Sequence, residues 1–442
     1  MAVTMNVADR TMGLSLRVLN LFAGSELVER AGLRKPAARL VERATRDGIK
    51  AAGTASRTFT AATRLGRPAR LRATSSSGLF DLTPDDDQQM LRDTFKEFGA
   101  GELRPRAQAA DAACEAPAEL IDQAAELGLT MLGVPEDLGG AVSERSAMTT
   151  VLVAEALANG DAGLATAILA PAGVAAALAL WGDADQQSTY LPPFVGDDVP
   201  GAALALMETR ALFNPFSLQT IARPKDGGYV LSGAKALVPG AAKAELFLVG
   251  AQLEGKGAAL FIVESSAAGV FTEPEPAMGL RAAATATLTL DEVGLPGMAL
   301  VGGGDPAVYA ECVHRARLAW CAVAVGTAQA VLDHVIPYVN ERKAFGEPIS
   351  HRQAVAFAVS DIAIELEGMR LALWRAASLA DREKPFAKEA AVARHLCATK
   401  GAVIGSQGVQ LLGGHGYVKE YPVERWFRDL RATGVMEGAL LV

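Results

Sequence analysis

The feature that most constrains the fold is a change of pattern along the chain, from helical periodicity to short alternating segments and back. Residues 81–200 carry amphipathic and alanine-rich runs, which predict an N-terminal helical domain. Residues 201–305 alternate, contain β-branched residues and are interrupted by glycine and proline, which predicts an antiparallel, barrel-like middle domain. Residues 306–442 return to long helical runs and predict a C-terminal four-helix bundle.

Individual helices can be expected within these regions. Three long runs, at 308–338, 352–381 and 389–412, should form most of the bundle. Near the start of the helical domain, residues 81–85 predict an N-cap with Pro84 at the first helical position. The uncharged run at 162–182 is mostly alanine and contains Pro171, so we expect a pair of buried helices there rather than a membrane span.

Composition narrows the class of protein. The 442 residues suffice for two or three domains, and the four cysteines and five histidines have no metal-ligand spacing. We therefore expect no metal site and no disulfide framework, which suits a reducing compartment. The net charge of −8 is uneven, because residues 1–74 hold 14 Lys or Arg and 5 Asp or Glu, a balance of +9, and the rest holds −17.

The basic extension, residues 1–80, has three interpretations that stay open. It could be an organelle transit peptide, a basic amphipathic anchor on an anionic membrane surface, or a solvated extension. Nucleic-acid binding is not expected, because the basic residues lack interleaved aromatic residues. The expected location is cytoplasmic, with peripheral membrane contact left open, or mitochondrial if the source is eukaryotic.

The last 30 residues combine a glycine cluster with a lone carboxylate, Glu437, in an apolar stretch of sequence. Glycines let a backbone approach a cofactor closely, and a carboxylate held among apolar residues is suited to proton abstraction. The block reads Gly413-Gly414-His415-Gly416-Tyr417, Tyr421-Pro422-Val423-Glu424, Arg428-Asp429 and Met436-Glu437-Gly438.

Three further blocks precede this one. They are Gly182-Asp183-Ala184-Asp185-Gln186-Gln187, then Asp226-Gly227-Gly228-Tyr229-Val230-Leu231-Ser232-Gly233-Ala234-Lys235, then Arg342-Lys343-Ala344-Phe345-Gly346 with Gln353. In this order, over residues 81–442, the four blocks resemble those of the FAD-dependent acyl-CoA dehydrogenases. The resemblance implies the helical, β and helical-bundle architecture of that family and a role in fatty-acid β-oxidation.

The resemblance also implies a reaction. Glu437 would abstract the α-proton of an acyl-CoA thioester while FAD takes the β-hydride, which gives the trans-2-enoyl-CoA. Some members carry the base at the position of Ala316, and alanine cannot serve, which favours Glu437. Arg317 and Gly438 would contact the substrate, and the backbone amide of Glu437 would hold the thioester carbonyl.

The implied FAD contacts fall into two groups, one of which serves the neighbouring subunit. Arg342 would reach the flavin pyrophosphate, because a guanidinium recognises phosphate oxygens in a bidentate way. The partners implied are an acyl-CoA substrate, an electron-transfer flavoprotein and a second copy of the chain, in a homodimer or homotetramer. The cofactor-binding set is Leu206, Met207, Leu237, Val238, Arg342, Phe345, Gln353, Gln410, Gly413 and Gly414.

Several positions depart from the family pattern. Met207 replaces the threonine beside the flavin ring, Phe213 replaces a serine that helps to hold the pyrophosphate, and Ala439 replaces the threonine after Glu437-Gly438. Pro239 removes both a hydroxyl and a backbone donor. The alternative to an active enzyme is therefore a catalytically weakened or inactive relative with a structural or assembly role. A flavin monooxygenase on the same fold is a third interpretation, but it gives Glu437 no task.

Overall fold

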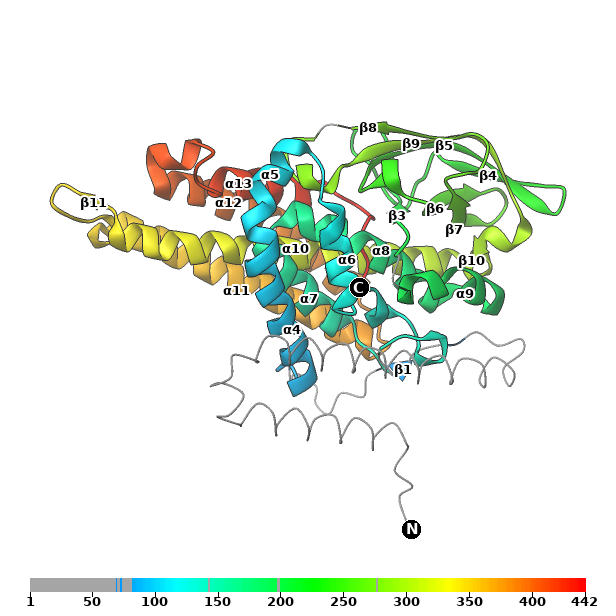
Figure 1. Ribbon diagram of the computed structural model, residues 1–442, viewed down its shortest axis with the longest axis horizontal. Coiled ribbons are helices and arrows are strands. Elements are labelled where there is room, and N and C mark those ends of the chain that lie inside the picture. Colours follow the sequence, from blue (N-terminus) through cyan, green and yellow to red (C-terminus); the bar gives the residue numbers. More distant parts are fainter. Residues whose placement is uncertain (1–68, 70–71, 74–81, 142–143, 197–198, 276) are drawn as a thin grey trace, which may run out of the picture. The chain divides into compact units, whose positions relative to one another are not determined.

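The computed structural model describes residues 69, 72–73, 82–141, 144–196, 199–275 and 277–442 (Figure 1). Most of the basic extension, on which the membrane and transit-peptide predictions depend, lies outside these residues. Strand β1 (Arg72–Ala73) pairs in parallel with β2 (Glu144–Arg145). The backbone of Ala69 exchanges two hydrogen bonds of 2.9 Å with the side-chain amide of Gln187.

The N-terminal domain is helical, as predicted, and its first helix begins at Asp86, two residues later than the sequence pattern indicated. The Asp85 carboxylate accepts a hydrogen bond from the Gln88 amide (2.8 Å), and the Gln88 side chain accepts one from the Asp85 amide (3.1 Å). This capping box places Pro84 before the helix rather than at its first position. The helices are α4 (Asp86–Phe98), α5 (Arg104–Ala113), α6 (Ala118–Glu126), α7 (Ala147–Gly160), α8 (Ala162–Trp181) and α9 (Ala184–Tyr190).

The alanine-rich run forms one helix, α8, and not the expected pair. Pro171 lies inside α8 and is buried, as are most residues of the helix. Packing on several sides outweighs the backbone hydrogen bond that proline removes. Helices α8 and α10 (Pro306–Glu341) are long and apolar enough to cross a membrane by composition, but most of each is buried in the protein, as in the core helices of globular domains.

The middle domain is an eight-stranded mixed sheet, so the prediction of an antiparallel domain was wrong in part. The hairpin predicted at 226–235 is present, with Asp226 and Gly227 at its turn, both at positive φ. The sheet order is β10-β7-β6-β4-β5-β9-β8, with β3 also paired to β6. The strands are β3 (Ala202–Ala205), β4 (Ile221–Lys225), β5 (Gly228–Val238), β6 (Leu246–Leu253), β7 (Gly257–Glu264), β8 (Val270–Pro274), β9 (Ala286–Leu295) and β10 (Leu300–Val301).

The parallel pairs arise because one long edge is interrupted by a loop. Strand β3 runs parallel to β6 along residues 246–249, and β4 continues in the same direction along residues 252–253. The chain leaves the sheet between them, at residues 206–220, and then returns to the same partner strand. This excursion contains Met207 and Phe213, two of the positions that depart from the family pattern.

The C-terminal domain has the four predicted helices. They are α10, α11 (Gln353–Asp381), α12 (Ala387–Leu412) and α13 (Val423–Thr433). Helix α10 packs against α7, α11, α12 and α13, and its 36 residues span about 54 Å. Figure 1 shows that the turn after α10, where β11 (Lys343–Ala344) pairs with β12 (Glu347–Pro348), forms one end of the bundle.

The chain after α13 turns back from the bundle to the sheet. The Ala439 amide donates to the Leu204 carbonyl oxygen (3.1 Å), which forms an antiparallel bridge to β3. Residues 439–442 are all buried, and the Leu441 backbone passes directly against Gly173 of α8. The tail therefore ties together the bundle, the sheet and the N-terminal helices.

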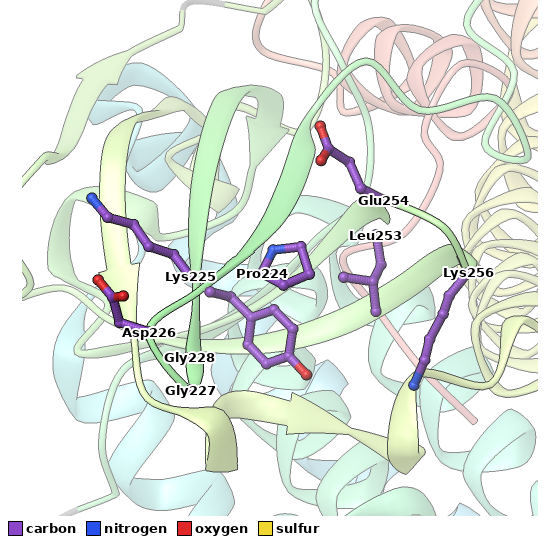
Figure 2. A pocket seen from close by; sticks show the side chains of 9 residues that line it. Pro224, Lys225, Asp226, Gly227, Gly228, Leu253, Glu254 and Lys256 are labelled. Atoms are coloured by element: carbon purple, nitrogen blue, oxygen red, sulfur yellow. The ribbon is translucent and has the colours of Figure 1, made fainter.

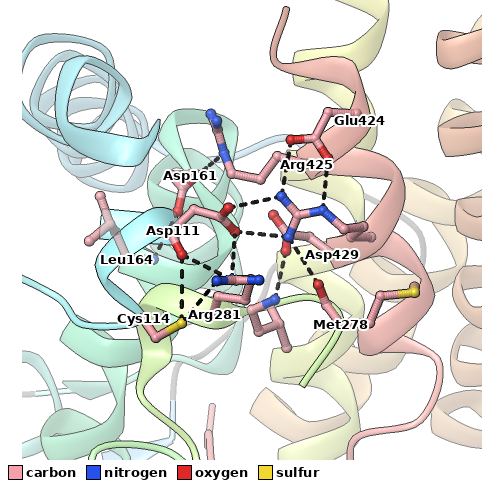
Figure 3. Close-up of polar contacts among 11 residues, drawn as sticks. Asp111, Cys114, Asp161, Leu164, Met278, Arg281, Glu424, Arg425 and Asp429 are labelled. Carbon is pink, nitrogen blue, oxygen red and sulfur yellow. Dashed lines mark hydrogen bonds and ion pairs between the residues drawn. The ribbon is translucent and has the colours of Figure 1, made fainter. Parts of the chain in front are cut away.

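A buried polar network joins the three domains near the start of α13 (Figure 3). Arg425 of α13 pairs with Asp161, the N-cap of α8, at 2.9 Å, and Arg428 binds both carboxylate oxygens of Asp111 in α5 at 2.8 and 3.0 Å. Asp429 accepts a hydrogen bond from the Leu280 amide in the middle domain (2.7 Å). Each pair links elements that are far apart in sequence.

Asp429 should make stability depend on pH. Its burial, with the nearby Asp161 charge, raises its pKa from 3.8 to about 8. Between these values the folded protein retains a proton that the unfolded chain releases, so raising the pH lowers the free energy of unfolding. We expect the Tm of Asp429→Asn, relative to wild type, to rise by about 2 °C or more between pH 5.5 and 8 in thermal melts. An offset that does not change with pH would contradict this assignment.

Candidate active site

Glu437 lies in the turn between α13 and the buried tail, and an arginine of α10 binds its carboxylate. Arg317 Nε lies 3.0 and 3.2 Å from the two carboxylate oxygens, and Arg317 Nη2 lies 2.9 Å from Oε1. Both side chains are mostly buried, with 12% of Glu437 and 17% of Arg317 exposed. The apolar setting expected for Glu437 is therefore wrong. The structure does bring three of the predicted residues together: Glu437, Arg317 and Gly438.

The residue after the carboxylate fits only as glycine. Gly438 has φ of 74°, and a Cβ on it would lie 2.7 Å from the Cβ of Leu206. Its carbonyl oxygen accepts a hydrogen bond of 2.6 Å from the indole Nε1 of Trp320 in α10. Leu206 is buried directly after β3, so the first of the predicted flavin-facing residues lies against the turn that carries Glu437.

The excursion between β3 and β4, residues 206–220, also lies near Arg317. The Phe216 ring, which is half-exposed, lies 5.6 Å from the Arg317 guanidinium carbon and 5.6 Å from the His314 ring. Tyr309 of α10 is buried and donates a hydrogen bond of 2.7 Å to the Pro215 carbonyl oxygen. Burial raises the pKa of the Tyr309 hydroxyl, which therefore stays protonated at neutral pH. The excursion thus contacts the helix that holds the arginine.

A buried ion pair fixes the start of the excursion. Lys235 of β5 is fully buried, and its Nζ lies 2.9 Å from Oε1 of Glu208. The Glu208 carboxylate also accepts hydrogen bonds of 2.8 Å from the amides of Gln219 and Thr220, at the other end of the excursion. Glu208, near the start of the excursion, therefore joins it to the end of the excursion and to Lys235 of β5.

The pKa directions follow from these contacts. Burial lowers the pKa of Lys235 to about 8, although the facing Glu208 carboxylate raises it in part. Burial also raises the pKa of Glu208, but Lys235 and the two backbone amides outweigh this effect and hold it below its usual value. At neutral pH the pair is ionised, which suits the short contact between its nitrogen and oxygen.

The remaining predicted cofactor residues gather at the other end of α10. Arg342 follows the last residue of the helix, Phe345 lies in the turn between β11 and β12, and Gln353 begins α11. Tyr338, one turn before Arg342, donates to the Leu412 carbonyl oxygen (3.2 Å), which brings the end of α12 to the same place. The group is exposed throughout and consists of Arg342, Phe345, Gln353, Gln410, Gly413 and Gly414.

The structure thus separates the predicted residues into two groups. Arg317 and Arg342 are 25 residues apart on one continuous helix, a distance of about 37 Å. Side chains so far apart cannot line one pocket of a single chain. The two groups can serve one ligand only if a second copy of the chain places its Arg342 end against the Glu437 end of the first.

The group of residues around Arg342 is suited to bind the adenosine and pyrophosphate of a dinucleotide. Within the part of the chain that the structure describes, no carboxylate lies within ion-pair distance of the exposed Arg342 guanidinium. The exposed Gln353 and Gln410 have no side-chain hydrogen bond among the residues that the structure describes, and a Cβ on Gly413, at φ of 58°, would face open space. An unpaired guanidinium, amide donors and an open glycine backbone are what a phosphate and its adenosine require.

The sheet end offers fewer polar contacts. The Met207 carbonyl accepts a hydrogen bond of 2.9 Å from the Ala236 amide, and the Leu237 amide donates one of 2.7 Å to Glu275. Val238 is buried and precedes Pro239, which has no N–H. This end therefore presents mainly an apolar surface, suited to a flat ring system, and leaves the charged part of a dinucleotide to the other group.

One surface hollow of about 390 Å³ lies away from both groups (Figure 2). It is lined by residues 224–229 of the β4–β5 hairpin and by Leu253, Glu254 and Lys256 at the β6–β7 turn. None of the predicted site residues lines it. The hollow is open, lies between strand turns and contains no group that the chemistry of Glu437 requires.

Sequence reasoning missed several residues around Glu437. No sequence motif links Glu437 to the residues that were missed, which are Trp320, Tyr309 and the Glu208–Lys235 pair. The available signals were a large tryptophan inside an alanine-rich helix and a lysine at a strand position that faces the core. Arg394 of α12 was also missed, although it contacts the turn that carries Glu437.

The chain belongs to the acyl-CoA dehydrogenase family. Its residues 85–198, 203–293 and 306–440 match the N-terminal, middle and C-terminal domains of acyl-CoA dehydrogenase, in that order. It is accordingly an FAD-dependent oxidoreductase with the acyl-CoA dehydrogenase fold. This confirms the family, the cofactor and the class of enzyme that the four sequence blocks predicted.

Three similar proteins span most of the chain. The mitochondrial short-chain specific acyl-CoA dehydrogenase of Bos taurus is 34% identical over 80% of this chain and 87% of its own length. Butyryl-CoA dehydrogenase from Megasphaera elsdenii is 29% identical, with a TM-score of 0.75 over 81% of this chain and 96% of its own. A chain from a structure of the electron transferring flavoprotein of Acidaminococcus fermentans gives the same four values.

The Glu208–Lys235 pair yields a prediction about stability. Lys235→Met should cost about 3–5 kcal/mol in urea unfolding, because it leaves a buried carboxylate without its counter-charge. The double variant Glu208→Gln with Lys235→Met should recover much of that loss, since no buried charge remains. As a control, Arg223→Met removes the exposed pair with Glu254 and should cost at most about 1 kcal/mol. Equal losses at the two sites would contradict the role assigned to the buried pair.

Proposed function

We propose that this enzyme oxidises an acyl-CoA thioester to the trans-2-enoyl-CoA, with Glu437 as the base that removes the α-proton. The observation that carries the proposal is the setting of Glu437. Its carboxylate is mostly shielded from water, and the turn that holds it packs against Leu206 at the sheet end of the predicted cofactor site. FAD, when bound, supplies the hydride acceptor.

The same turn offers a donor for the substrate carbonyl. The Glu437 amide makes no hydrogen bond to another backbone group in the described part of the chain, whereas the amides on both sides of the turn, at Met436 and Ala439, are bonded. A thioester carbonyl that accepts from this amide would bring its α-carbon near the carboxylate. A donor at this position stabilises the negative charge that develops on the carbonyl oxygen.

Arg317 has a defined task in this proposal. In the structure it binds both oxygens of Glu437, so the carboxylate must turn away from at least one guanidinium nitrogen to reach the α-carbon. Arg317 orients the carboxylate before the substrate arrives, because the planar guanidinium binds both carboxylate oxygens in a fixed geometry. Phe216, which lies against Arg317, limits the directions in which the guanidinium can move.

The proposed substrates and partners follow from the relatives. We propose a straight-chain acyl-CoA, with butyryl-CoA as the first compound to test, because similar proteins carry the names short-chain and butyryl-CoA dehydrogenase. Electrons would leave through an electron-transfer flavoprotein. The separation of the two residue groups supports a homodimer, or a homotetramer built from dimers, in which each FAD site uses both chains.

The first test of this function is the response of bound flavin to an acyl-CoA. Purified wild-type protein should show flavin absorption that bleaches when butyryl-CoA is added without oxygen. Glu437→Gln should keep the flavin and its spectrum but lose bleaching by at least about 1000-fold, because the amide cannot accept the proton. Full bleaching in this variant would remove Glu437 from the mechanism.

A second candidate function is supported by one observation at the sheet end. The Leu237 amide is occupied by Glu275, whose carboxylate also accepts from the Thr287 hydroxyl (3.2 Å), and Pro239 provides no donor. A chain that holds flavin weakly would serve as a structural subunit on the same fold. A colourless protein that added FAD does not reconstitute would favour this candidate over the enzyme.

A site shared between two chains predicts complementation. Arg342→Ala and Glu437→Gln should each be inactive in a homo-oligomer, the first through lost FAD and the second through the lost base. Co-expressed at equal levels, they should give about a quarter of wild-type activity, because half of the dimers are hybrids with one intact site of two. FAD content should be about half that of wild type, because the Glu437→Gln homodimers keep their flavin and each hybrid keeps one of two. Bleaching is therefore the measurement that reports complementation.

A mixture that stays inactive, with hybrid dimers shown by mass spectrometry, would contradict the shared site. A surface arginine outside both groups serves as the matched control. Arg106→Ala removes an exposed pair with Glu102 and should leave FAD content unchanged.

A further inference from the structure

Arg394 of α12 binds the backbone of the turn that carries Glu437, and no sequence pattern identified it. Its guanidinium donates hydrogen bonds to the carbonyl oxygens of Thr433, Gly434 (3.2 Å) and Met436 (2.6 Å). Only 13% of the side chain is exposed, and its Nε lies 4.0 Å from Oε1 of Glu437. One side chain therefore binds three carbonyls within four residues of the chain.

Two of these carbonyls, at Thr433 and Gly434, lie at the end of α13, where they would otherwise be left without helical partners, and the Met436 carbonyl lies beyond the helix. Helix α13 ends at Thr433, and the last carbonyls of a helix have no amide to bind within the helix. Cations at this end are favourable, because the helix dipole leaves partial negative charge there. The planar fork of a guanidinium can bind several carbonyls at once, which an ammonium group does less well.

The other side of the turn is fixed separately. Trp320 binds the Gly438 carbonyl oxygen, and the Ala439 amide binds Leu204. Glu437 is thus held between a backbone clamp from α12 on one side and contacts from α10 and β3 on the other. Arg317 binds the carboxylate itself and, among the residues that the structure describes, makes no hydrogen bond with the backbone of the turn. The backbone before Glu437 depends on Arg394.

We propose that Arg394 is a positioning residue for the reaction, which fixes the backbone of residues 433–437 so that the Glu437 carboxylate meets the α-carbon. The inference rests on the proposed role of Glu437 as the base. A displacement of about 1 Å at such a carboxylate costs up to about 100-fold in rate. Substrate affinity should change little, since Arg394 binds the backbone of the turn and has no proposed contact with the substrate.

The test compares Arg394→Met, Arg394→Lys and a matched control, Lys400→Met. Lys400 lies on the same helix and pairs with Glu365 at 2.7 Å, away from the turn. Arg394→Met should lower the limiting rate of flavin bleaching by butyryl-CoA about 10- to 100-fold, and the concentration that gives half the limiting rate should stay within about threefold. Arg394→Lys should restore part of the rate, and Lys400→Met should match wild type.

A second measurement does not depend on activity. The amides of Val435 and Met436 both donate to the Ala432 carbonyl oxygen, at 2.8 and 3.1 Å, so they report the order of the turn. Their hydrogen exchange should be at least about 10-fold faster in Arg394→Met than in wild type or Lys400→Met. If Arg394→Met does not fold, Arg394→Lys carries both measurements, with smaller effects in the same directions.

The outcomes separate the two proposals. If wild type bleaches, Glu437→Gln does not, and Arg394→Met bleaches within twofold of wild type, the positioning role is wrong and the proposed function stands. If wild type does not bleach, the proposed function fails, and hydrogen exchange alone decides whether Arg394 fixes the turn. Unchanged exchange at Val435 and Met436 in Arg394→Met would overturn the inference in either case.

Discussion

The structure depends on one unbroken helix. Helix α10 packs against five other helices. It supplies Tyr309, Arg317 and Trp320 in its first half, and Arg342 lies just beyond its end. A helix has a fixed rise per residue, so the distance between Arg317 and Arg342 cannot be adjusted by loops. The division of the predicted cofactor residues into two distant groups, and the proposal of a site shared by two chains, both follow from this rigidity.

Glu437 and its turn are held by two helices of the C-terminal bundle and by one strand of the middle domain. Helix α10 binds the Glu437 carboxylate and the Gly438 carbonyl oxygen, and α12 binds the Met436 carbonyl oxygen. Strand β3 binds the Ala439 amide. The buried ion pairs at Asp161 and Asp111 fix α13 to the helical domain, and the hydrogen bond of Asp429 fixes it to Leu280 of the middle domain. Buried charges that lose a partner are costly, so such pairs set the relative placement of the elements even where they add little net stability.

The helical parts of the fold could be predicted from the sequence because helix periodicity is local. The runs at 308–338 and 389–412 lie within α10 and α12, and the run at 352–381 begins one residue before α11 and ends with it. The sheet was predicted less well. Strands β3 and β4 share one partner strand across the 206–220 excursion, and the alternation of side chains within a strand does not indicate whether its neighbour is parallel. The prediction of two helices at Pro171 also failed, because the packing of α8 on several sides outweighed the tendency of proline to end a helix.

The sequence by itself determined the family, the enzyme class, the cofactor and the order of the helical and β regions, because motif residues and periodicity are properties of short segments. Only the tertiary structure decided that Glu437 pairs with Arg317, that Glu208 closes the excursion through Lys235, and that Arg394 binds the turn before the carboxylate. These contacts join residues that are 27 to 120 positions apart. Contacts at such separations depend on how whole elements pack, and no local pattern in the chain encodes that packing.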